Sequence, residues 1–219
     1  MHQEGLTIKF RHSFKLTGVE FMNNTSRVGT IHRKTKETDI ALSLKLDGQG
    51  ITSVESGVSF MDHMLTLFGV HGFFDLEVKG EGDVEVDDHH TVEDLGICLG
   101  QAFKQALGDL SGICRYGFSV IPMDEALAQV TVDISNRPYL HYDVPIKDQK
   151  VGTFDTPLAK EFLRAFSLHA GLTLHVRVLH GDNTHHMIEA VFKALGRALA
   201  QAVSLEPRAT GPLSSKGSL

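Results

Sequence analysis

Apolar residues recur at helical spacing near the C-terminal end of the chain. The stripe consists of Ile188, Val191, Phe192, Leu195, Leu199 and Val203, which share one face of an α-helix of about 3.6 residues per turn. Asn183 and Thr184 stand just ahead of it and offer side-chain oxygens to the backbone N–H groups of a first turn. The pattern therefore predicts a helix that begins close to His185 and buries its apolar face.

The chain also contains an internal duplication. Residues 63–78 align without a gap with residues 161–176, and residues 95–107 align without a gap with residues 191–203. The apolar positions agree in kind throughout this alignment, so each half predicts a helix, a strand, a turn and a second helix.

Runs of strand-like residues precede these helices at residues 39–46 in the first half and at residues 129–134 and 141–144 in the second. Helices packed on a sheet in two similar halves predict an α+β sandwich, that is, two duplicated halves with a β-sheet packed against helices in each. We expect residues 27–118 to form the first half and residues 119–206 the second, with the boundary near Gly117–Asp124.

The two ends of the chain differ from this pattern. Residues 207–219 are polar and predict a separate C-terminal tail. Residues 1–26 carry Lys9, Arg11 and Lys15 among apolar residues, which is a weak organelle-targeting signal. Their acidic residues and scarcity of Ser instead favour a poorly ordered N-terminal extension.

The composition excludes several classes of protein. The chain has 219 residues, of which 42% are hydrophobic, enough to bury a core. A formal net charge of −6 argues against a nucleic-acid or acidic-membrane surface. No apolar run reaches the roughly 18 residues of a membrane span. Cys98 and Cys114 are the only thiols, so we expect no disulfide framework and a reducing, cytoplasmic location.

Two short runs share one chemical pattern, HHTVE at residues 89–93 and HHMIE at residues 185–189. On a helix, the first His and the Glu of each run are four positions apart and lie on one face. The middle residues, His90 and His186, are turned by about 100° from their neighbours and cannot easily join the same chelate. Since imidazole and carboxylate are good ligands for divalent metals, each run is expected to contact two metal ions.

Together these motifs resemble the imidazoleglycerol-phosphate dehydratase family, from about Arg27 to the C-terminus. The resemblance rests on Asp62-His63-Met64, on residues 33–38, 87–96 and 183–190, and on Ser214-Ser215-Lys216-Gly217. It implies a carbon–oxygen lyase of histidine biosynthesis that dehydrates imidazole glycerol phosphate to imidazole acetol phosphate. It further implies two Mn²⁺ per active site and a homo-oligomer of twenty-four subunits with active sites between subunits.

The resemblance and the helix geometry together divide the metal ligands into two sets. One metal would take His63, His90, His185 and Glu189. The other would take His89, Glu93, Glu161 and His186. Because Mn²⁺ commonly accepts six ligands, each metal would keep positions for water or substrate. Many relatives carry His where this chain has Glu161, and a carboxylate is a reasonable replacement. Asp62 and Asp88, beside the ligands, are expected either to accept ring N–H bonds or to cap their helices.

The resemblance also assigns the residues that would contact substrate. Glu37 would act as the acid–base group, and His71 would contact substrate or transfer protons. His169, which aligns with His71 in the duplication, receives no catalytic role. The phosphate would be bound by Arg115, Arg137, Lys193, Ser214 and Lys216. The last two lie in the C-terminal tail, residues 207–219, which would close over the phosphate. No glycine-rich nucleotide motif is present, so no nucleotide is expected.

Two other classes stay open on the sequence alone. A two-metal phosphatase or other hydrolase could use the same ligands to activate water, with metals about 4 Å apart. In a purely structural assembly, the metals would only join subunits. Glu37, Arg115 and Arg137 argue against that last alternative, because joining subunits requires no contacts to a substrate.

Overall fold

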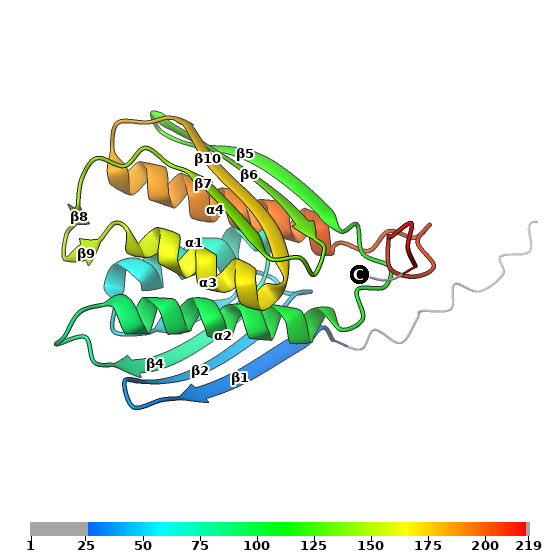
Figure 1. Ribbon diagram of the computed structural model, residues 1–219, viewed down its shortest axis with the longest axis horizontal. Coiled ribbons are helices and arrows are strands. Elements are labelled where there is room, and N and C mark those ends of the chain that lie inside the picture. The colour runs from blue at the N-terminus through cyan, green and yellow to red at the C-terminus, as the bar shows by residue number, and fades with distance from the viewer. Residues whose placement is uncertain (1–25, 218–219) are drawn as a thin grey trace, which may run out of the picture.

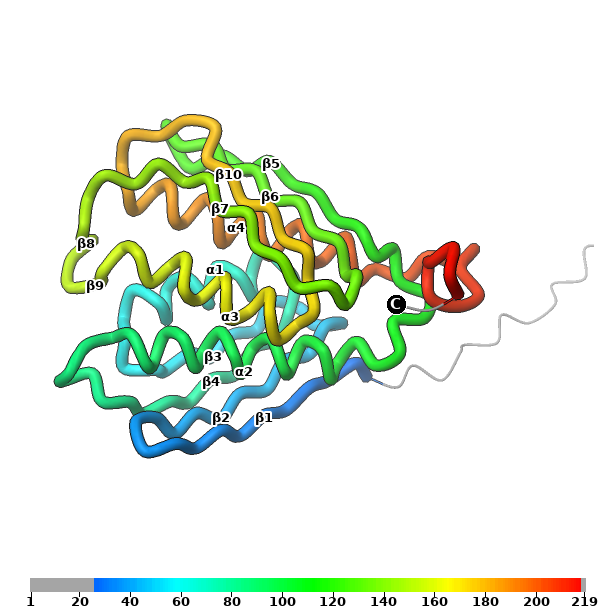
Figure 2. The backbone as a smooth tube through the Cα atoms, in the orientation of Figure 1, coloured from blue at the N-terminus to red at the C-terminus, as the bar shows by residue number. Residues whose placement is uncertain are grey.

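The structure is a computed structural model that describes residues 26–217. The predicted N-terminal extension therefore lies almost wholly outside the described residues. Two four-stranded sheets form the outer layers of the molecule, and four helices lie between them (Figure 1). The backbone trace shows the same order of layers (Figure 2). The predicted α+β sandwich is confirmed.

The first half contributes one sheet and two helices. Its strands, in spatial order, are β1 (Val28–Lys34), β2 (Thr38–Lys45), β4 (Asp75–Gly82) and β3 (Thr52–Glu55). Its helices are α1 (Ser59–Gly72) and α2 (His89–Leu107). Neighbouring strands are antiparallel except for β3, which runs parallel to β4.

The second half repeats this topology strand for strand. Its sheet consists, in spatial order, of β5 (Tyr116–Met123), β6 (Ala126–Ile134), β10 (Leu172–His180) and β7 (Tyr139–Asp143). Its helices are α3 (Leu158–Ala170) and α4 (Thr184–Val203), and a ribbon of β8 (Lys150–Val151) and β9 (Phe154–Asp155) precedes α3. Here β7 is the strand that runs parallel, to β10.

The duplication extends to single hydrogen bonds. In the first half, the backbone N–H of Thr30 donates to Oε1 of Gln105 at 2.8 Å, which ties the edge strand β1 to α2. In the second half, the backbone N–H of Phe118 donates to Oε1 of Gln201 at 2.8 Å, which ties β5 to α4. In both halves, therefore, a glutamine on the long helix accepts a hydrogen bond from a backbone N–H of the edge strand.

The core lies between the sheets and the helices. Along β6, inward positions are buried at every second residue, as expected for a strand with one face on the core. The helices meet through aromatic side chains, namely Phe68, Phe103, Phe162, Phe166 and Phe192, all fully buried. Burial of each such side chain contributes about 1.5–3 kcal/mol relative to an exposed position. This packing fixes the helix ends that carry the candidate ligands.

The predicted strands correspond closely to the observed ones. β2 covers the predicted run at residues 39–46 except for its last residue, β6 contains residues 129–134, and β7 overlaps residues 141–144. The sequence pattern did not predict the strands β1, β3 and β5.

The proposed boundary between the halves, at residues 118 and 119, falls within β5. The domain limits stay predictions.

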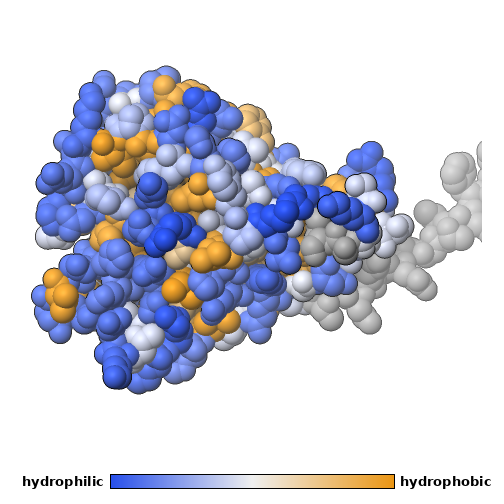
Figure 3. Space-filling model, viewed as in Figure 1, coloured by the Kyte–Doolittle hydropathy of each residue, from blue (hydrophilic) through white to orange (hydrophobic). Residues whose placement is uncertain are grey.

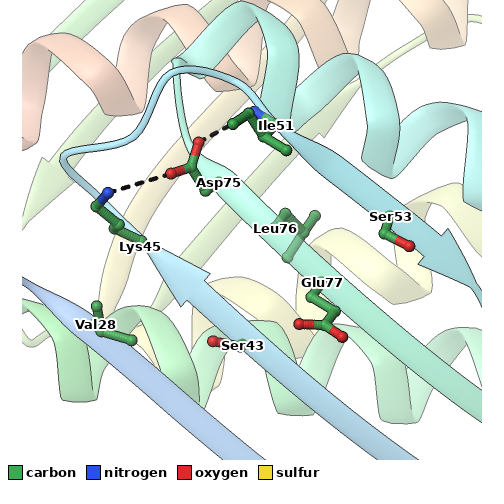
Figure 4. Close-up of a pocket in the computed structure, with 8 residues that line it drawn as sticks. All are labelled: Val28, Ser43, Lys45, Ile51, Ser53, Asp75, Leu76 and Glu77. Atoms are coloured by element: carbon green, nitrogen blue, oxygen red, sulfur yellow. Dashed lines mark hydrogen bonds and ion pairs between the residues drawn. The ribbon is translucent and has the colours of Figure 1, made fainter.

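The surface carries no large apolar face in the view of Figure 3, where small apolar patches are separated by hydrophilic residues. Among the described residues, none of the helices is both long and apolar enough to cross a membrane. A concavity of about 320 Å³ lies on the outer face of the first sheet, where Lys45 and Asp75 form an ion pair at 3.4 Å (Figure 4). None of the predicted site residues lines this concavity.

Candidate metal centre

Both HHxxE runs lie in the first turns of long helices, α2 and α4. Asn183 caps α4, because its Oδ1 accepts from the backbone N–H of His185 at 2.9 Å and of His186 at 3.3 Å. Thr184, the other capping candidate, instead donates its hydroxyl to Asp148 at 2.8 Å. Helix starts have unpaired N–H groups, so these local hydrogen bonds fix the turns that present the His side chains.

The first cluster combines His63 on α1 with His185 and Glu189 on α4. The Nε2 atoms of His63 and His185 lie 3.5 Å and 3.3 Å from Oε2 of Glu189. One ligand atom from each of the three residues lies within 4.8 Å of the others. Phe60 contacts His185 edge to face at a ring-centroid distance of 5.2 Å, which restricts the imidazole.

Glu189 is the buried member of this cluster, with 7% of its surface exposed. Burial opposes its ionisation, but Lys193 and His63 together hold its pKa below the ordinary value of a Glu. One carboxylate oxygen thus faces Lys193, at 2.6 Å, while the other faces the two imidazoles. Two imidazoles and an ionised carboxylate with converging atoms fit a divalent cation such as Mn²⁺.

The second cluster lies where α2 and α3 pack together. The Nε2 of His89 lies 3.9 Å from Oε2 of Glu93, the predicted chelating pair. Arg164 brings in Glu161, because its guanidinium contacts Oε2 of Glu161 at 2.8 Å and Oε1 of Glu93 at 3.5 Å. The structure therefore places Glu161, on α3, near Glu93 of α2, at the position that aligns with His63 in the duplication.

The two middle histidines belong to neither cluster of their own chain. The Nδ1 of His90 lies 3.1 Å from Oδ2 of Asp83, and the Nδ1 of His186 lies 2.7 Å from Oε2 of Glu125. These hydrogen bonds raise the pKa of both imidazoles, and His186 lowers the pKa of Glu125 to about 2. Three residues of the first predicted set thus converge within the chain. In the second set His89 pairs with Glu93, and Glu161 is joined to Glu93 through Arg164.

Asp62 does not accept a ring N–H bond. Its Oδ1 accepts from the backbone N–H and the hydroxyl of Ser56, at 3.0 Å and 2.5 Å, and so fixes the entry to α1. Asp88 makes no side-chain capping bond to α2, and burial raises its pKa. The carboxylates that do hold imidazoles, Asp83 and Glu125, were missed by the sequence reasoning. Glu125 could have been found, because it immediately precedes β6 as Glu37 immediately precedes β2.

The two candidate catalytic residues lie in different places, Glu37 near His90 and His71 near Lys193 and Glu189. Glu37 occupies the exposed turn between β1 and β2, where its Oε2 is 4.0 Å from Nδ1 of His90. His71 lies in the last turn of α1. Burial lowers the pKa of His71, and the charges of Lys193 and Arg197 lower it further, so the neutral imidazole is favoured.

The candidate phosphate residues do not all come together in one chain. Arg115 is buried and bonded to Asp133 through Nε at 2.7 Å and Nη2 at 3.1 Å. Its Nη1 donates to the carbonyl of Leu213 in the C-terminal tail at 2.5 Å. Arg137, whose side chain is exposed, approaches the same carboxylate at 3.6 Å, so Asp133 orients Arg115 and forms an ion pair with Arg137.

A pocket of about 550 Å³ opens between Arg115 and the C-terminal tail, and Ser214 lines it. The backbone N–H of Lys216 donates to the hydroxyl of Ser214 at 3.2 Å. Figure 1 shows that α2 and α4 begin at the end of the molecule opposite this tail. Of the five candidates, only Lys193 therefore contacts a metal cluster of its own chain.

The duplicated α+β fold, its helix-end clusters of His and Glu, and its likeness to solved enzymes place the chain in the class of dehydratases, or hydro-lyases. Residues 56–199 match the family model described as imidazoleglycerol-phosphate dehydratase. The chain belongs to the imidazoleglycerol-phosphate dehydratase family.

Individual relatives agree with this assignment. Imidazoleglycerol-phosphate dehydratase from Desulfotalea psychrophila is 57% identical over 89% of this chain and 97% of its own length. The enzyme from Syntrophobacter fumaroxidans is 58% identical over 88% and 98%. The crystal structure of the enzyme from Staphylococcus aureus superimposes with a TM-score of 0.75 at 43% identity, covering 82% of this chain and 99% of that one. For the enzyme from Pyrococcus furiosus, the TM-score is 0.74 at 36% identity, covering 86% and 100%.

Proposed function

We propose that this chain converts imidazole glycerol phosphate to imidazole acetol phosphate and water, as a step of histidine biosynthesis, with two Mn²⁺ in each active site. The observation that carries this proposal is the convergence of His63, His185 and Glu189 on one point. Family membership supplies the reaction, and the donor atoms supply the reason for a divalent metal.

Each proposed Mn²⁺ would be held by four side chains of two kinds, imidazole and carboxylate. His63, His90, His185 and Glu189 would hold one Mn²⁺, and His89, Glu93, Glu161 and His186 would hold the other. Carboxylate and imidazole together suit Mn²⁺, which accepts both oxygen and nitrogen ligands. Bound Mn²⁺ would supply a Lewis acid that stabilises negative charge on the substrate ring.

Each active site would lie between copies of the chain, in a homo-oligomer that we propose to contain twenty-four subunits. Two observations support this arrangement. His90 and His186 are held away from the clusters of their own chain, by Asp83 and Glu125. The pocket at Arg115 and the tail lies at the opposite end of the molecule from the helix starts.

The residues of the chain divide the remaining tasks. Glu37, at an exposed turn, would move the proton between carbon and solvent, and the neutral His71 would accept or return a proton near Lys193. Arg115 and Arg137, held by Asp133, would bind the phosphate together with Lys193, Ser214 and Lys216. A guanidinium that is already oriented loses less entropy when it binds an anion.

Family membership favours this reaction over the two-metal phosphatase. A phosphatase would hold both metals about 4 Å apart across one phosphoryl group. In this chain, the two clusters instead form on different helix pairs, α1 with α4 and α2 with α3.

A cytoplasmic location is also proposed, in keeping with the bacterial origin of the relatives.

The first test is turnover. The full chain would be stripped with EDTA, reloaded with MnCl₂ and mixed with imidazole glycerol phosphate, and the enolisable ketone would be followed by absorbance. We expect turnover that depends on Mn²⁺ and is lost in Glu37→Gln, while that variant keeps its metal. A metal-loaded, assembled chain without turnover would overturn the proposal, and full turnover by Glu37→Gln would remove Glu37 from the mechanism.

A further inference from the structure

Two turns occupy the same place in the duplicated halves, and each carries a Glu. Glu37 immediately precedes β2, and Glu125 immediately precedes β6. Each Glu is near the middle His of the helix that packs on its sheet, His90 on α2 or His186 on α4. The distances differ, however: the closest approach to Nδ1 is 4.0 Å for Glu37 and 2.7 Å for Glu125.

The difference is explained by a third carboxylate that only the first half contains. Asp83 follows β4 and holds Nδ1 of His90 at 3.1 Å and 3.2 Å through its two oxygens. At the same separation before His186, the second half has Leu179, which is 46% exposed and cannot accept a hydrogen bond. In the second half, therefore, Glu125 makes the contact that Asp83 makes in the first.

Both contacts set the tautomer of the imidazole. A carboxylate only accepts hydrogen bonds, so the proton of a neutral ring must be on Nδ1. The lone pair is then on Nε2, and the ring is held in one orientation. Histidines that bind metals are commonly fixed in this way, by a carboxylate on the nitrogen that does not bind.

We infer that Asp83 and Glu125 are positioning residues, which hold His90 and His186 with Nε2 free to bind a divalent metal on another copy of the chain. This inference rests on the proposed function. It explains why the duplicated glutamates have diverged. Because Asp83 holds His90, Glu37 is free to act on substrate, whereas Glu125 is committed to His186 and also accepts from the backbone N–H groups of Asp182 and Asn183.

The test measures metal binding rather than turnover. The metal-free full chain would be titrated with MnCl₂ by calorimetry, and bound Mn²⁺ would be counted by elemental analysis. Glu125→Ala is expected to weaken one of the two Mn²⁺ sites about 10–100-fold, and Asp83→Ala the other. The double variant should weaken both. Glu125→Gln, which keeps an oxygen acceptor for Nδ1–H, should regain most of the loss.

The controls remove a charge from the same loops without touching a ring. Asp124→Asn changes the turn that contains Glu125, and Glu85→Gln changes the loop that contains Asp83; both should bind two Mn²⁺ with the affinity of the parental chain. Since Glu125 also supports the start of α4, thermal unfolding of each metal-free variant shows whether it still folds. Within residues 26–217, the side chain of Asp83 bonds only to His90, so Asp83→Ala tests the inference even if Glu125→Ala unfolds.

The outcomes separate the two proposals. If the parental chain binds two Mn²⁺ and turns over, and both alanine variants bind as the parental chain does, the positioning role is wrong and the proposed function stands. If the parental chain binds no Mn²⁺ and does not turn over, the proposed function is wrong, and the positioning role falls with it.

Discussion

The Nζ of Lys193 lies 2.6 Å from Oε1 of Glu189, one helical turn away on α4. The two side chains are mostly buried, with 15% and 9% of their surfaces exposed. In the metal-free chain, Lys193 is thus the cation that neutralises a carboxylate of the first cluster. Lys193 therefore has two candidate roles, since it pairs with Glu189 and is also a candidate for binding the phosphate.

Removal of Lys193 should destabilise the metal-free chain. In Lys193→Met, the carboxylate of Glu189 stays buried without its closest charged partner, at an expected cost of about 1–3 kcal/mol. Added Mn²⁺ should restore more stability to this variant than to the parental chain, because the metal replaces the missing charge. Urea unfolding in EDTA and in MnCl₂ measures both effects. Lys160→Met, at an exposed position of α3, is the matched control, and equal midpoints for the two variants would contradict the argument.

The edge strands β1 and β5 each carry a glycine where they face a long helix, α2 or α4, and neither position should tolerate a side chain. A Cβ at Gly117 would lie 1.8 Å from the carbonyl oxygen of Ala198, and a Cβ at Gly29 would lie 1.9 Å from that of Ala102. Gly117→Ala and Gly29→Ala must therefore push strand and helix apart, at about 1–3 kcal/mol each. Gly211→Ala, where a Cβ meets nothing within 4 Å, should be nearly neutral. Urea midpoints of the three variants would test this, and a neutral Gly117→Ala would mean that β5 does not pack on α4 as described.

Cys98 should resist alkylation in the folded chain. The side chain is fully buried on α2, and burial raises the pKa of its thiol to about 12. Only the thiolate reacts, so at pH 8 almost no reactive form exists and labelling should rise only as the pH approaches 12. Iodoacetamide followed by peptide mass spectrometry would show Cys98 unmodified in buffer and modified in urea. Rapid labelling of Cys98 in buffer at pH 8 would be inconsistent with the packing of α2 against α3.

Much of the fold could be predicted from the sequence, because α4 and β6 have regular apolar periods. β5 could not, because its pattern is inverted. Its inward positions are the small residues Gly117 and Ser119, which let α4 approach closely, while Tyr116 and Phe118 are exposed on the outer face. An edge strand of this kind lacks the apolar inner face that sequence patterns detect.

The candidate site was predictable to a similar extent. His89 with Glu93, and His185 with Glu189, are neighbours by helix geometry alone, so spacing is sufficient to pair them. Asp83 and Glu125 were missed because their contacts cross from loop to helix and depend on how each sheet packs. His90 and His186 are held by Asp83 and Glu125, so the fold of one copy does not bring them to the ligand sets that the resemblance assigns to them.

Loss of one chelating His should remove both metal and assembly. His185 contributes Nε2 to the first cluster, 3.3 Å from Glu189, and the proposed fourth ligand of that metal comes from another copy. His185→Ala should therefore lower the Mn²⁺ content by about one ion per chain and reduce the mass of the oligomer measured by light scattering, as should EDTA treatment of the parental chain. His32→Ala, whose ring contacts Asp39 on the first sheet instead, should change neither quantity. A His185→Ala particle of parental mass and full metal content would show that this metal does not join copies of the chain.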